Sequence, residues 1–171
     1  KAGDRVGIWL KNCPEYIPAL FGVLEAGAVV VPINNFLKAP EVNFILADAD
    51  IDVLITEAAM AEAMAELSAS RPSLRVLQIE ELGHLEAGSV APSFESDRVA
   101  TDLAVIIYTS GTTGRPKGAM LSHGNLLHNV ESCRQVLEAV SFDRFVVLLP
   151  MFHSFMLCVG ILLPLIVGGS I

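Results

Sequence analysis

Short apolar runs rich in branched side chains alternate with helix-forming segments over the first 80 residues of this 171-residue chain. The expected strands are residues 5–10, 28–31, 52–56 and 74–79, and the helical segments between them are 12–27, 41–46 and 57–68. Strands separated by helices pair in parallel, because the helix carries the chain back across the sheet. The alternation therefore predicts an α/β fold with parallel-rich sheets and flanking helices.

The start of the first predicted helix carries a capping signal. Asn12 can accept a hydrogen bond from a free amide of the first turn, Pro14 has the φ of a first-turn residue, and Glu15 follows three residues after Asn12. Gly27 suits the exit of this helix. We therefore expect Asn12 to be the helix cap.

Residues 81–102 interrupt the alternation. They contain glycine, proline and several acidic residues with little periodicity, so we interpret them as a connector between a first half, 1–80, and a second half, 103–171. In the second half we expect a strand at 103–108, a helix at 122–140, a strand at 145–149 and a final helix.

Charge and composition exclude several classes of protein. The net charge of −8 argues against nucleic-acid binding, which needs clustered basic residues. Residues 145–171 have no charge, but prolines and glycines interrupt them, which favours buried elements over a membrane span. The cysteines Cys13, Cys133 and Cys158 form no C-x-x-C pair, which is typical of reduced thiols in a cytoplasmic protein.

The segment from Tyr108 to Gly118 combines three glycines, four Ser or Thr hydroxyls and one lysine. Glycines let the backbone approach a ligand closely, and successive amides form a concavity that binds anions. Hydroxyls and a lysine ammonium donate to phosphate oxygens. We therefore predict a phosphate-binding loop made of Thr109, Ser110, Gly111, Thr112, Thr113, Gly114, Arg115, Pro116 and Lys117.

This loop differs from a Walker loop, in which four residues separate the first glycine from a Gly-Lys-Ser/Thr end. Counted from Gly111, the second glycine would stand at position 116, which is Pro116, and Lys117 is followed by Gly118. The predicted helix also begins only near Ser122. We expect phosphate binding by the loop rather than by the helix N-terminus.

The same run, continued through residues 119–123, resembles the signature of the acyl-adenylate-forming (AMP-binding) superfamily of acyl-CoA synthetases, luciferases and peptide-synthetase adenylation domains. Further segments agree with the family in the same order, at residues 3–6, 12–15, 24–34, 41–42, 53–56 and 149–155. The chain most resembles fatty acyl-CoA synthetases. The resemblance implies that 1–171 is part of the large N-terminal domain of an adenylate-forming enzyme.

The resemblance implies a reaction in two halves. A carboxylate attacks the α-phosphate of ATP to give acyl-AMP and pyrophosphate, with Mg²⁺ on the phosphates, and a thiol such as that of CoA then takes the acyl group. Residues 109–117 would hold the β- and γ-phosphates, and His153 and Phe152 would line the substrate pocket. The family's catalytic lysine is expected beyond Ile171, so we expect no catalytic residue or protein-held metal within 1–171.

Two further expectations follow from the resemblance. The chain alone should be inactive, and its 53% hydrophobic composition indicates surface meant for other parts of the enzyme, through which it should self-associate.

Aliphatic and aromatic residues around His153 favour a fatty substrate, although they also suit a core: Met151, Phe152, Phe155, Met156 and Leu157. Met156 stands where many relatives carry glycine, and we expect it to narrow or reshape the acyl pocket.

Two alternatives remain open from the residues alone. A phosphotransferase or NTPase would need an acidic Mg²⁺ ligand at the end of a nearby strand, whereas Asp102 opens a predicted strand and Asp143 precedes one. A non-catalytic α/β nucleotide-binding module would leave the many donors of the loop without a catalytic role. An acid–thiol ligase accounts for more of the sequence than either alternative does.

Overall fold

The computed structural model describes residues 2–82, 97–109 and 115–171. Within these residues, six strands form one sheet in the order β4-β3-β1-β2-β5-β6. The strands are β1 (Arg5–Trp9), β2 (Val29–Pro32), β3 (Ile51–Thr56), β4 (Arg75–Gln78), β5 (Leu103–Thr109) and β6 (Lys117–Ser122). All neighbouring strands are parallel except β5 and β6, which are antiparallel. The predicted parallel-rich α/β fold is confirmed.

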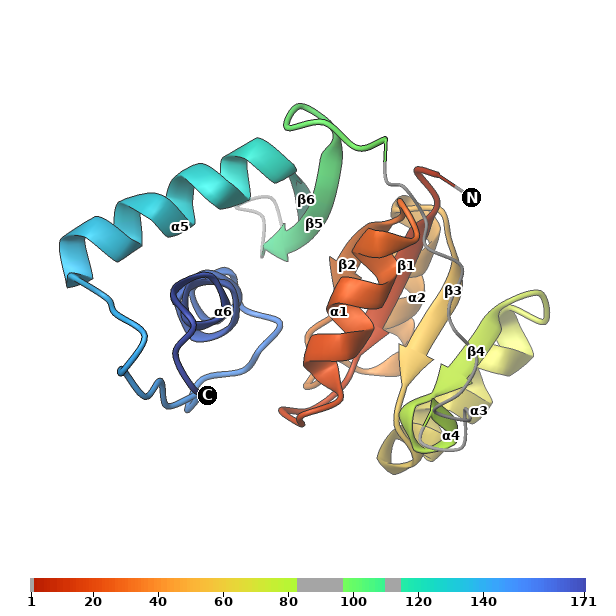
Figure 1. Ribbon diagram of the computed structural model, residues 1–171. Helices are drawn as coiled ribbons and strands as arrows, with labels where there is room; N and C mark the ends of the chain where they lie inside the picture. The colour runs from red at the N-terminus through yellow and green to blue at the C-terminus, as the bar shows by residue number, and fades with distance from the viewer. Residues whose placement is uncertain (1, 83–96, 110–114) are drawn as a thin grey trace.

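Helices cover both faces of this sheet (Figure 1). The helices of the first half are α1 (Tyr16–Glu25), α2 (Ala39–Asp48), the short 3₁₀ segment η1 (Ala58–Met60), α3 (Ala61–Ser70) and α4 (Ile79–Leu82). Successive side chains of a strand point to opposite faces, so Ile8 joins the core cluster under α1, whereas Trp9 joins the cluster under α2 and α3. Both faces are buried, as a parallel sheet requires.

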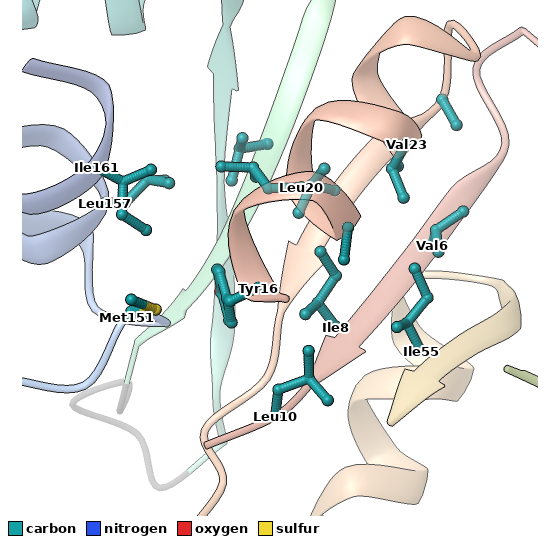
Figure 2. Packing of buried hydrophobic residues seen from close by; sticks show 14 of the residues in the cluster. Val6, Ile8, Leu10, Tyr16, Leu20, Val23, Ile55, Met151, Leu157 and Ile161 are labelled. Carbon is teal, nitrogen blue, oxygen red and sulfur yellow. The ribbon is translucent and has the colours of Figure 1, made fainter. Parts of the chain in front are cut away.

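The second half of the chain packs against the same core. Its helices are α5 (His123–Leu137), the π-helical segment η2 (Met156–Leu162) and α6 (Leu163–Val167). Met151, Leu157 and Ile161 belong to the cluster that contains Tyr16 and Leu20 of α1, as Figure 2 shows. Strand β5 joins the sheet beside β2, so residues before and after the predicted connector share one sheet and one core.

Strand β6 corrects the predicted path after the glycine loop. We expected a loop through Gly118 followed by a helix, but residues 117–122 pair with β5 as the second arm of a hairpin. The helix α5 then begins with Ser122 as its N-cap, whose hydroxyl accepts a hydrogen bond from the Asn125 amide at 3.1 Å. The helix ends at Leu137 rather than at residue 140.

The predicted strand at 145–149 is wrong. Only an isolated parallel bridge forms near it, between Arg144 and Ser170. Phe145 and Val147 pack inward against core clusters, whereas Val146 and Leu148 are exposed. The apolar pattern of a strand is present, but in the described residues no neighbouring strand supplies the hydrogen bonds of a ladder. Among those residues, no helix is both long and apolar enough to cross a bilayer.

The predicted helix cap at Asn12 is also wrong. The residue before α1 is Glu15, and it makes no side-chain cap. The Asn12 amide nitrogen instead donates to the Leu149 carbonyl at 2.9 Å, and its amide oxygen accepts from the Met151 amide at 2.8 Å. Asn12 therefore joins the end of β1 to a segment that follows almost 140 residues later.

Candidate active site

A cavity of about 900 Å³ lies where the C-terminal ends of β2 and β5 meet α2 and the segment 152–154. Its wall is formed by Pro32, Asn34, Leu37, Pro40, Glu41, Phe44, Ile45, Ile107, Tyr108, Thr109, Arg115, Pro116, Phe152, His153 and Ser154. Open α/β sheets bind ligands outside the carboxyl ends of their strands. The position and size of this cavity fit a small-molecule site.

The described ends of the glycine loop open into this cavity. Thr109 ends β5 and pairs with Lys117, the first residue of β6. Thr109, Arg115 and Pro116 line the cavity, whereas Lys117 is exposed outside its lining. Five of the predicted phosphate-binding residues lie outside the described residues: Ser110, Gly111, Thr112, Thr113 and Gly114. The described ends of the loop therefore lie on the two arms of a hairpin beside the cavity.

The structure places His153 and Phe152, the two residues predicted to line a substrate pocket, in the wall of the same cavity. The Phe152 ring meets the Phe36 ring edge-on, with centroids 6.4 Å apart. The Phe155 amide donates to His153 Nδ1 at 3.3 Å. When the imidazole is neutral, this bond assigns Nδ1 as the acceptor and leaves Nε2 with the proton. His153 can therefore donate a hydrogen bond from Nε2.

Asn12 positions this segment. Its two hydrogen bonds, to the carbonyl of Leu149 and the amide of Met151, hold the chain immediately before Phe152 and His153. The capping role predicted for Asn12 is wrong because local capping signals carry no information about contacts with a distant loop.

Gly118, the last glycine of the signature, has a structural role beside the Tyr108 ring. A Cβ on Gly118 would lie 2.7 Å from Ile106 Cγ2 and 3.3 Å from the Tyr108 ring. The glycine therefore leaves room for the Tyr108 ring, whose hydroxyl donates to the Asp48 carboxylate at the end of α2. Burial and this hydrogen bond raise the pKa of Tyr108 above its ordinary value. The bond joins β5, just before the loop, to α2.

The sequence reasoning missed the α2 wall of the cavity, which includes Pro40, Glu41, Phe44 and Ile45. The Glu41 carboxylate accepts a hydrogen bond from the Lys38 amide at 2.9 Å, at the start of α2. One signal for this wall was available in the sequence: α2 carries the apolar residues Pro40 and Phe44 in addition to those on its buried face.

A second cavity, of about 450 Å³, lies between β5, β6, α5 and η2. It is lined by Ile107, Leu121, Asn125, Leu126, His128, Asn129, Ser154, Leu157 and Cys158. Met156 lines neither cavity. Its side chain is buried and lies over Gly160, where an added Cβ would be 2.1 Å from the Met156 sulfur. In the described residues, Met156 thus fills space within its own helical segment, and the expected narrowing of a pocket is not seen.

Comparison with known proteins identifies the family. The family model described as AMP-binding enzyme matches residues 1–171, the whole chain. The chain belongs to the AMP-binding enzyme family. Feruloyl-CoA synthase of an Amycolatopsis species is 40% identical over all of this chain and 34% of its own length. Long-chain-fatty-acid–CoA ligase FadD15 of Mycobacterium bovis is 41% identical over 90% of this chain and 28% of its own length.

Solved structures of the same fold agree with this assignment. The inhibitor-bound N-terminal domain of FACL13 from Mycobacterium tuberculosis has a TM-score of 0.90 and 31% identity, and covers 99% of this chain and 43% of that domain. ATP-bound MatB from Rhodopseudomonas palustris has a TM-score of 0.87 and 29% identity over 99% of this chain and 35% of MatB. The chain thus has the fold of the N-terminal domain of adenylate-forming enzymes, and it spans about a third of the length of the curated relatives it matches.

Proposed function

We propose that the protein containing this chain is an acid–thiol ligase of the acyl-CoA synthetase type. It would join a carboxylic acid to AMP at the expense of ATP, release pyrophosphate, and transfer the acyl group to CoA. The observation that carries the proposal is the opening of both ends of the glycine loop into the cavity that contains Phe152 and His153, in a chain matched throughout by the AMP-binding family. The family match favours this proposal over an NTPase or a non-catalytic module.

In the proposed reaction, residues 109–117 hold the β- and γ-phosphates. Backbone amides and hydroxyls of the loop, with the cations Arg115 and Lys117 on its second arm, would stabilise the charge that develops on the departing pyrophosphate. The exposed Thr109 and Arg115 at the cavity mouth suit an anionic ligand. In this proposal, Mg²⁺ would be held through the phosphates.

For the acyl group, we propose a fatty acid, with His153 and Phe152 beside its carboxylate. Three of the residues that suggested a fatty chain, Met151, Met156 and Leu157, are buried, so their apolar character also serves the core. The named relatives include a feruloyl-CoA synthase and a long-chain-fatty-acid–CoA ligase. A panel of fatty acids and hydroxycinnamates in a CoA-dependent assay tests this choice, and preferred use of a hydroxycinnamate would overturn it.

The loop assignment is tested in the full-length enzyme with Lys117→Ala and Thr112→Ala. We expect a fall in acid-dependent ATP–pyrophosphate exchange of roughly a hundredfold for the lysine variant and about tenfold for the threonine variant. Matched controls are Lys11→Ala and Thr101→Ala at exposed positions away from the cavity lining. Unchanged exchange rates in both loop variants would defeat the phosphate assignment.

We predict that residues 1–171 alone form no acyl-adenylate. The chain spans about a third of its curated relatives, and the remaining groups of the proposed reaction would come from other segments. The purified chain should release no pyrophosphate with ATP, Mg²⁺ and a fatty acid, whereas the full-length enzyme should release it under the same conditions. Acid-dependent release by the chain alone would contradict the prediction.

We place the enzyme in the cytoplasm, where the three free cysteines of this chain would stay reduced.

A further inference from the structure

Two of the three cysteines face each other across neighbouring helical elements. Cys133 lies on α5 and Cys158 on η2, and their sulfur atoms are 4.0 Å apart in a half-buried position. Apolar residues around them, such as Val130 and Leu163, form the small core cluster that joins α5 to η2 and α6. The pair is therefore held together by packing rather than by chance contact of exposed side chains.

Asn129 fixes the position of both thiols. Its side-chain oxygen accepts from Cys158 Sγ at 3.1 Å and from Cys133 Sγ at 3.5 Å. One acceptor shared by two thiols keeps both sulfur atoms on the same side of α5 and stabilises the reduced pair. Asn129 and Cys158 also line the second cavity. Cys133 lies outside that lining and is half-buried on α5, where a small reagent can reach it.

The distance permits a covalent bond after a small movement. Sulfur atoms in a disulfide are about 2.05 Å apart, so the two side chains must close about 2 Å from their positions in the reduced protein. Rotation of both thiols away from Asn129, together with a slight approach of the packed helices, would supply this movement. Disulfides of this kind in reducing compartments are usually transient and redox-sensing.

We propose that Cys133 and Cys158 form a reversible modification site, at which a small-molecule disulfide oxidises the pair to an intramolecular disulfide that ties α5 to η2. Because Cys158 and Asn129 belong to the wall of the second cavity, the bond would fix that wall. The proposal concerns the thiols themselves and stands independently of the proposed ligase activity.

The chemistry is balanced by the named oxidant. Burial, followed by the neighbouring Cys133, raises the pKa of Cys158 to about 12, which makes Cys158 a poor first nucleophile. Cys133 loses its proton and attacks one sulfur of the small disulfide, forming a mixed disulfide and releasing one small thiol. Cys158 then gives its proton to solvent, and its sulfur attacks Cys133 Sγ and expels the second small thiol. The protein loses two protons and two electrons, which reduce the small disulfide to two thiols.

The test uses the reduced protein and glutathione buffers of increasing disulfide fraction. After alkylation and proteolysis, mass mapping should find a peptide that links Cys133 to Cys158, and a reductant should release it. The bond closes a loop between residues 25 positions apart, so oxidation should raise the Tm by about 5 to 10 °C. Alkylation of both cysteines at every buffer composition would overturn the proposal.

Three variants locate the bond. Cys158→Ser should stop the reaction at a mixed disulfide on Cys133, and Cys133→Ser should leave Cys158 reduced. The matched control Cys13→Ser should form the same cross-link as the parent protein. Asn129→Ala should form the bond at a lower disulfide fraction, because the reduced pair loses its shared acceptor. A link that survives in Cys133→Ser, or a stable mixed disulfide in the parent protein, would each contradict the proposed pair.

Discussion

Tyr16 carries a hydroxyl that the fold buries without a hydrogen bond. The side chain is fully buried under α1, and its oxygen has no partner among the described residues. A buried polar group without a partner costs about 1 to 3 kcal/mol. We therefore predict that Tyr16→Phe raises the free energy of unfolding by about 1 kcal/mol, measured by urea denaturation at neutral pH. A loss of stability on removing the hydroxyl would show that it has a partner.

Tyr16→Phe should also change how the free energy of unfolding depends on pH above pH 10. Burial raises the pKa of Tyr16 above its ordinary value near 10. Between that value and the higher pKa of the folded state, the folded protein keeps a proton that the unfolded chain releases, so stability is complete below pH 10 and falls as pH rises further. Tyr16→Phe should flatten this decline. An unaltered slope above pH 10 would assign the decline to other groups, of which Tyr108 is one.

Two glycines offer a matched comparison at the residue scale. A Cβ on Gly118 would lie 2.7 Å from Ile106 Cγ2 in the sheet. One on Gly22 of α1 would meet no atom of the described residues within 4 Å, apart from its chain neighbours and the backbone of its own helix. Gly118→Ala should destabilise the fold by about 1 to 3 kcal/mol through overpacking. Gly22→Ala should stabilise it by about 0.5 to 1 kcal/mol through helix propensity. Thermal unfolding checks both, and equal effects of the two substitutions would refute the steric argument.

At the scale of elements, sequence patterns within a segment predicted the strands and helices that depend mainly on local interactions. The strands β1 to β5 and helices α1 to α3 follow from apolar runs and helical spacing within each segment. Strand β6 escaped prediction because its side chains are mostly exposed and include Lys117 and Gly118, so no apolar pattern marks it. The segment 145–149 has the pattern but no ladder partner in the described residues. A strand needs a neighbour, and its own sequence does not specify one.

Among contacts between segments far apart in the chain, the hydrogen bonds from Asn12 to residues 149 and 151 matter most for the site. Asn12→Ala removes both hydrogen bonds, and we expect a loss of about 1 to 3 kcal/mol of stability, from two bonds of about 0.5 to 1.5 kcal/mol each. In the full-length enzyme it should also raise the KM for the carboxylate, because the segment carrying Phe152 and His153 loses its anchor. Denaturation and steady-state kinetics measure the two effects.

The controls for Asn12 separate its donor from its acceptor. Asn12→Asp keeps the acceptor for the Met151 amide but loses the donor to the Leu149 carbonyl, so its effects should be intermediate. Asn35→Ala, which removes a side chain with no hydrogen bond in the described residues, should leave stability and kinetics near those of the parent. If Asn12→Ala behaved like Asn35→Ala, the proposed anchoring role would be lost.

At the scale of the whole molecule, the candidate site is assembled from segments that the sequence separates widely. The glycine loop and His153 were predicted from their motifs, and the structure brings the described loop ends and His153 to one cavity. The α2 wall and the Asn12 anchor were not predicted, since each depends on where the fold places a helix or loop against a distant strand. A motif identifies the residues proposed to contact a ligand. The residues that position them, such as Asn12, carry no motif that separates them from residues with a local role such as helix capping.

The exposed apolar surface of the second half predicts self-association. Phe142 is 92%, Leu148 83% and Val146 72% exposed, on a stretch that follows α5. Large apolar side chains exposed close together in the chain are typical of interfaces or aggregation-prone regions. We predict that residues 1–171 sediment as oligomers at micromolar concentration, and that Val146→Lys with Leu148→Lys shifts them toward the monomer. Val99→Lys, at an exposed apolar residue on another part of the chain, should leave the distribution unchanged. A monomeric parent chain would contradict the prediction.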